Sequence, residues 1–199
     1  MSGPLNLSKL KSEVLYILQK TGKTDFHKLF KILYFADMWH IKERGRTIVT
    51  NDYVAMKNGP VPSTLYDIIK DIKFNKYTPS LPNWRDAFEV EGYFINSLQE
   101  PDLDELSEND IITLDSVIEW ALPKSMNELT ELSHGIAYQR GLGTLRNKAI
   151  NIYDIAEESG ATAEQIRLMK ERDIIRKILA RPDDRALTSN HNVICTSQQ

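Results

Sequence analysis

The chain has 199 residues, a net charge of −3 and a pI near 5.8, with a hydrophobic fraction of 41% and a charged fraction of 27%. These fractions are those of an ordinary globular protein and argue against global disorder. The slightly acidic balance argues against a protein whose main role is to neutralise phosphates, so nucleic acid is not the expected partner.

The only cysteine, Cys195, lies four residues from the C-terminus. It excludes an intramolecular disulfide and predicts a reducing compartment. The N-terminus shows no apolar core of a signal peptide, and nowhere do 18 apolar residues run together. We therefore expect a cytoplasmic protein with no membrane partner.

Two amphipathic helices are predicted near the N-terminus. Apolar residues recur at three- and four-residue steps over residues 7–18, and Gly22 is the expected C-terminal cap. A second helix begins after Thr24 or Asp25 as N-cap and ends at Gly45.

Residues 47–57 are rich in β-branched and aromatic side chains, which predicts a short strand that leads into a turn at Asn58-Gly59. Pro60 and Pro62 cannot donate backbone hydrogen bonds, so this strand is expected to be an edge strand at best. Pro62 or a residue just beyond it suits the first turn of a third helix, which continues with apolar residues to Ile72.

Alternating side chains on both sides of Gly92 predict a small hairpin over residues 87–97. We expect this hairpin to pair with the strand before the Asn-Gly turn. The predicted fold class is therefore α+β and predominantly helical, with a helical core and a small antiparallel β-sheet.

Capping signals mark two later helices. Ser107 caps a helix that Pro123 ends, and Ser125 and Glu128 form a capping box for a short helix that runs to about His134. For both helices the capping residue therefore also predicts where the helix begins.

The C-terminal part is less regular. Gly141 and Gly143 are predicted to interrupt the chain before a helical stretch at residues 150–158, and Thr162 caps a last helix. Large apolar residues gather on one side of that helix: Leu168, Ile174, Ile175, Ile178 and Leu179.

These patterns predict three parts. Residues 1–150 form the main domain, and residues 151–180 form a helical extension packed on or beside it. Residues 181–199 have little to bury and are expected to be a disordered tail.

Asp37 and His40 lie three residues apart on the apolar face of the second helix. Such a pair could orient a general base, but the sequence supplies no motif for a nucleophile or an activated water. A buried carboxylate needs hydrogen bonds, so Asp37 more simply accepts them from a neighbouring backbone or from His40. We therefore expect no catalytic residue, and a structural role for both side chains.

The sequence predicts no metal and no cofactor. The four histidines and Cys195 show no zinc spacing, and the acidic residues after Pro101 lack the glycine and glutamate of a calcium loop. The turn at Lys57-Asn58-Gly59-Pro60 precedes a helix start, yet it matches no phosphate-binding pattern.

Three segments in order carry a resemblance to a known family: KLFKILYFADMWHIKERGR, DYVAMKNGPVPSTLYDIIK and SENDIITLDSVIEWALPKSMNELTELSH. Together they closely resemble the Panacea domain of the SocA-like antitoxin family. The resemblance covers roughly Asp25 to Tyr138. Relatives often carry a tryptophan shortly after the histidine of the last block, where this chain has Ala137-Tyr138-Gln139.

The resemblance implies a bacterial or phage protein that is not an enzyme and that neutralises a toxin protein encoded beside it. Neutralisation would be steric or would deliver the toxin to a cytoplasmic protease. The residues that match the family signature, as structural or binding residues, are Asp37, Trp39, His40, Lys57, Asn58, Gly59, Pro60 and His134. The mainly helical fold with a small antiparallel sheet that the family implies agrees with the pattern above.

Two other function classes stay open at this point. A nucleic-acid-binding regulator of its own operon is the alternative, and a hydrolase or transferase acting through Asp37 and His40 is a third class. Neither the toxin nor the oligomeric state can be deduced from the residues. We expect partner-specific contacts in residues 151–199, outside the resembling blocks.

Overall fold

The computed structural model describes residues 5–49, 52–144 and 148–179. Within them the chain forms α1 (Leu7–Thr21) and α2 (Phe26–Arg44) at the N-terminal end. Asp25 caps α2 by accepting a hydrogen bond from the His27 N–H, and Gly45 ends it in the left-handed conformation. The first two predicted helices are thus confirmed.

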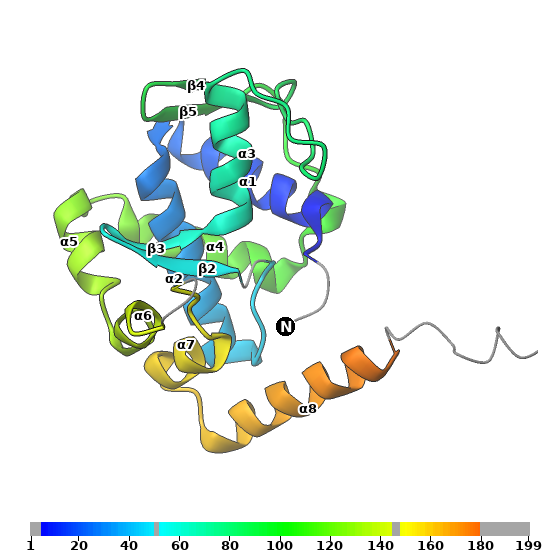
Figure 1. The fold of residues 1–199 in the computed structure, drawn as a ribbon, viewed down its shortest axis with the longest axis vertical. Helices are drawn as coiled ribbons and strands as arrows, with labels where there is room; N and C mark the ends of the chain where they lie inside the picture. Colours follow the sequence, from blue (N-terminus) through cyan, green and yellow to red (C-terminus); the bar gives the residue numbers. More distant parts are fainter. Residues whose placement is uncertain (1–4, 50–51, 145–147, 180–199) are drawn as a thin grey trace, which may run out of the picture.

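Helix α2 lies at the centre of the molecule, with the other elements arranged around it (Figure 1). Every residue from Leu29 to Met38 is buried, so α2 has no solvated side over almost three turns. Strand β3 and helices α4, α5 and α7 cover different sides of it. This explains how one helix can hold Lys31, Asp37 and His40 inside the core.

The Asn-Gly turn joins two short strands, β2 (Tyr53–Met56) and β3 (Gly59–Pro62). These two strands form a two-stranded sheet, so β2 is an edge strand of its sheet, as predicted. Its second edge binds residues 148–150: Ala55 donates to the Lys148 carbonyl, and Ile150 donates to the Tyr53 carbonyl. β3 is also an edge strand, which is why it tolerates two prolines.

Helix α3 (Ser63–Lys73) follows β3 with Pro62 as its N-cap, as predicted. The predicted hairpin is also present, as β4 (Phe88–Glu91) and β5 (Phe94–Ser97). Its expected pairing was wrong. Strand β5 pairs with the two-residue strand β1 (Thr24–Asp25), in the order β1-β5-β4, because β3 and residues 148–150 already occupy both edges of β2.

The rest of the described chain is helical. After a short 3₁₀ turn, η1 (Leu103–Glu105), come α4 (Glu108–Ala121), α5 (Met126–Leu132), α6 (Ile136–Leu142), α7 (Ile152–Ser159) and α8 (Ala163–Leu179). The capping boxes at Ser107 and Ser125 are formed. The fold class is α+β and mostly helical, as predicted, with two small antiparallel sheets instead of one.

Helix α6 was not predicted, because Gly141 and Gly143 were expected to interrupt this stretch. Gly141 is instead a buried helical residue, where an added Cβ would lie 2.8 Å from a side-chain carbon of Ile150. The glycine therefore serves the close approach of α6 to the segment beside β2.

At the C-terminal end α7 packs on α2 and α6, while α8 contacts α7 and extends along the outside of the molecule (Figure 1). The predicted tail at 181–199 lies outside the described residues. No helix in the described part of the chain is long and apolar enough to cross a membrane.

Candidate functional site

The residues of the family signature divide between two places in the fold, one at the β2–β3 turn and one around the middle and end of α2. We call Lys57, Asn58, Gly59 and Pro60 the signature turn. Lys57 and Asn58 are exposed at its tip, whereas Gly59 and Pro60 are buried. Gly59 has a φ of 101°, a backbone conformation that residues other than glycine rarely adopt.

Side chains from two helices explain why position 59 is a glycine. A Cβ at Gly59 would overlap the Nζ atom of Lys31 from α2, and it would lie 2.6 Å from Oγ of Ser133. The backbone of the signature turn thus closes directly over these two polar groups.

Lys31 is an unusual residue for this position, because its side chain is only 2% exposed. Its ammonium donates one hydrogen bond, 3.4 Å long, to the Pro60 carbonyl. Burial lowers the pKa of Lys31 to about 7. A positive charge is therefore poorly accommodated beneath the turn.

His134 ties the end of α5 to the same hairpin. Its ring stacks on that of Tyr138 with centroids 4.1 Å apart, and the Tyr138 hydroxyl donates to the Met56 carbonyl at 2.8 Å. Burial and the nearby Lys31 lower the pKa of His134, so the ring is neutral at neutral pH. Among the described residues, its Nε2 has no hydrogen-bond partner. The Tyr138 hydroxyl therefore links His134 to the β2–β3 hairpin.

Asp37 holds the chain that leads into β2. Its two carboxylate oxygens accept hydrogen bonds of 2.8 Å from the Ile48 N–H and the Tyr53 hydroxyl. Burial raises the pKa of Asp37 to about 7, although these hydrogen bonds act in the opposite direction. From the sequence, Asp37 was expected to accept a hydrogen bond from a neighbouring backbone or from His40. In the structure it accepts one from the backbone, at Ile48, and His40 pairs with other groups.

His40 instead joins a buried charged cluster. Its Nδ1 lies 2.9 Å from the Arg46 carbonyl, and its Nε2 lies 3.1 Å from Oδ1 of Asp110 on α4. Asp110 also pairs with Lys9 of α1 at 2.6 Å and with Arg46 at 2.9 Å. Although burial alone would raise it, hydrogen bonds from His40, Lys9 and Ser107 hold the pKa of Asp110 well below its usual value. This cluster connects three helices, with His40 and Asp110 fully buried and Lys9 and Arg46 partly exposed at its edge.

Trp39 lies apart from the signature turn. Its ring packs at 5.6 Å from that of Trp120, and it borders a shallow surface cavity of about 350 Å³. The other residues that line this cavity are Met38, Lys42, Glu43, Glu158 and Ser159. Glu158 also contacts the start of α6, because it accepts a hydrogen bond of 2.7 Å from the Ala137 N–H.

Sequence reasoning missed Lys31, Asp110 and Glu158. Lys31 could have been noticed, because it is surrounded in sequence by the most apolar stretch of the chain. The contacts of Asp110 and Glu158 depend on tertiary packing alone. No group of three metal-ligating side chains is found in the ranges that the structure describes, and His191 and Cys195 lie outside them.

Comparison with known proteins identifies the family. A family model described as the SocA-like antitoxin, Panacea domain, matches residues 29–137. No curated protein and no solved structure matches the chain. The matched range contains α2 from residue 29 onward, both strands of the signature turn and His134, and it agrees with the range of the resemblance. Since the match spans more than half of the 199 residues, the chain belongs to the SocA-like antitoxin family and carries its Panacea domain.

Proposed function

We propose that this protein is an antitoxin that binds a toxin protein encoded beside it and neutralises it, either by covering its active surface or by delivering it to a protease. The observation that carries the proposal is the family match over residues 29–137. On this proposal the protein acts in the cytoplasm by binding and has no catalytic residue.

The geometry around Asp37 and His40 supports a scaffold role for the signature. Both side chains are buried, and their partners are groups of the fold itself. Asp37 positions β2 through Tyr53, and β2 carries the signature turn. We infer that these residues fix the presentation of the exposed tip at Lys57 and Asn58, which a partner can reach.

Co-expression tests the proposed function. The product of the neighbouring reading frame is induced in a bacterial host with and without this protein. We expect arrested growth without this protein, rescue when it is present, and a complex of the two proteins on gel filtration. Failure to rescue a toxic neighbour, with both proteins soluble, would contradict the proposal.

A second measurement separates binding from catalysis. Asp37→Asn replaces one of the two carboxylate oxygens that accept hydrogen bonds from Ile48 and Tyr53, so we expect a lower melting temperature. The loss of growth rescue should then match the fraction of the variant that is unfolded. Loss of rescue in a variant with unchanged melting temperature would favour a chemical role for Asp37. Retention of DNA at low salt with a steep loss at higher salt would instead favour the operon regulator.

A further inference from the structure

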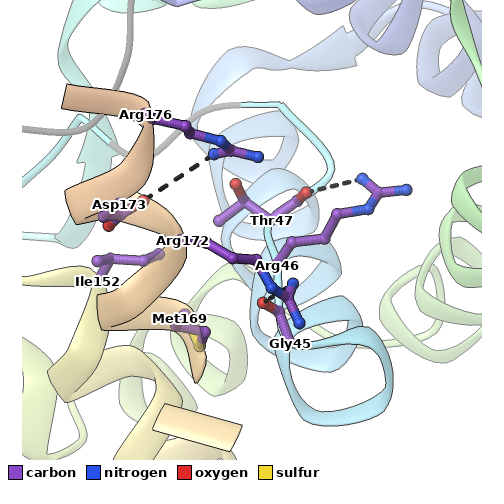
Figure 2. A pocket seen from close by; sticks show the side chains of 8 residues that line it. All are labelled: Gly45, Arg46, Thr47, Ile152, Met169, Arg172, Asp173 and Arg176. Carbon is purple, nitrogen blue, oxygen red and sulfur yellow. Dashed lines mark hydrogen bonds and ion pairs between the residues drawn. The ribbon is translucent and has the colours of Figure 1, made fainter. Parts of the chain in front are cut away.

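A small cavity lies where α8 passes the connection from α2 to β2 (Figure 2). Its volume is about 40 Å³, enough for a group of a few atoms. Its charged lining comprises three arginines, Arg46, Arg172 and Arg176, and one carboxylate, Asp173. The excess of cations suits an oxyanion.

Two of the three guanidinium groups already serve the fold. Arg46 donates to the Thr47 carbonyl and to Asp110, and in Figure 2 its guanidinium is turned away from Arg176. Arg172 donates to the Gly45 carbonyl at 3.3 Å, which satisfies the C-terminal end of α2. These two contacts need no ligand to explain them.

Arg176 is different. Its side chain is 62% exposed, and the carboxylate it pairs with, Asp173, is 3.9 Å away and also accepts a hydrogen bond from Tyr153. In the described part of the chain Arg176 has no other ion pair. Figure 2 shows its guanidinium beside Thr47, whose side chain also lines the cavity. Most of its N–H donors are therefore open to a partner group.

An apolar stripe runs along α8 next to this cavity. Leu168, Ile175 and Leu179 follow one another at seven and four residues, so they share one face of the helix, and they are 36%, 55% and 78% exposed. By the same spacing, Arg172 and Arg176 lie along one flank of the stripe. On another side of α8, Met169 is buried against the body of the protein, and Asp173 accepts a hydrogen bond from Tyr153.

We propose that Arg176 and the stripe Leu168–Ile175–Leu179 form a docking surface for the toxin, which places a carboxylate against Arg176 and apolar side chains on the stripe. This inference rests on the proposed function and names the surface that carries it out. The surface lies outside residues 29–137, so it can differ among proteins that share the Panacea domain.

A protein segment fits this surface better than a nucleic acid. A phosphate backbone requires a row of cations, whereas α8 also carries Glu164 and Glu171, which pair with Arg167. An apolar stripe beside a single open guanidinium instead matches interfaces in which arginine and large apolar side chains provide most of the affinity.

The test uses the full-length chain and the product of the neighbouring reading frame. Arg176→Ala removes the cation and Ile175→Asp places a charge on the stripe. Arg167→Ala is the matched control, because it is an equally exposed arginine of the same helix that does not line the cavity. We expect each of the first two variants to weaken binding at least tenfold by calorimetry, and the control to stay within about twofold. Melting temperatures verify that all variants are folded.

The outcomes separate the two proposals. If the wild type binds and rescues, and the two variants bind as tightly as the control, the docking surface is wrong while the antitoxin function stands. If the wild type neither binds nor rescues, both are wrong. If the variants instead convert a wild-type dimer into monomers without weakening toxin binding, the surface joins two copies of this chain, which also overturns the inference.

Discussion

Replacing Lys31 by methionine tests the idea that a buried cation beneath the signature turn weakens the fold. Methionine keeps the length of the side chain without its charge. The pKa of Lys31 falls from 10.5 to about 7, and at 1.36 kcal/mol per pH unit the buried ammonium costs about 5 kcal/mol below pH 7. The lost hydrogen bond to Pro60 offsets about 1 kcal/mol. We expect Lys31→Met to raise the free energy of unfolding by about 2–4 kcal/mol at pH 7.

The pH dependence gives the sharper test. Between about pH 7 and 10.5 the unfolded chain binds a proton at Lys31 that the folded chain lacks, so the stability of the wild type rises with pH in this window. The advantage of the variant should therefore shrink as pH rises from 7 to 10. Urea unfolding at several pH values measures it, and Lys42→Met, an exposed lysine of the same helix, is the control. A variant that is less stable than the wild type at pH 7, or a difference that does not change with pH, would refute the reasoning.

Three further changes are expected to alter stability, each measured by thermal or urea unfolding. Gly59→Ala should destabilise by about 2–4 kcal/mol, because it adds a positive-φ penalty to the overlap with Lys31, and an unchanged melting temperature would contradict this. Glu13→Met should stabilise at pH 7, because both carboxyl oxygens are buried without hydrogen-bond partners among the described residues. Burial raises the pKa of Glu13 most, and Asp37 adds to it, so at pH 7 the folded state binds a proton that the unfolded state lacks. The gain should therefore shrink as pH falls from 7 towards about 4.5 and stay constant below that. Asp110→Ala should cost about 3–5 kcal/mol, because it leaves His40, Lys9 and Arg46 without their shared carboxylate, and a loss under 1 kcal/mol would show that the cluster is solvated.

Local signals predicted most of the helices because their causes are local. Asp25, Ser107 and Ser125 cap helices through contacts within three residues, and Gly45 ends α2 by its own backbone conformation. The Gly92 hairpin is equally local.

The errors have a common physical source in tertiary contacts. β5 pairs with Thr24–Asp25, about 70 residues earlier in the chain, and two residues are too few to show a strand pattern. Gly141 lies inside a helix because Ile150 packs against it, which no spacing reveals. At the candidate site Lys31 and Asp110, which determine the environment of the signature residues, were not predicted, because their contacts come from other elements of the fold.

The cluster at Asp110 also has a consequence for synthesis on the ribosome. Lys9, His40 and Arg46 all precede their shared carboxylate, by 101 residues in the case of Lys9. The side of α2 that α4 covers stays open to water until α4 has left the exit tunnel. The first half of the chain therefore emerges without α4 and without the Asp110 carboxylate. A growing chain of this protein is therefore most exposed to aggregation and proteases while about its first 110 residues are outside, and becomes protected only when α4 closes over the central helix.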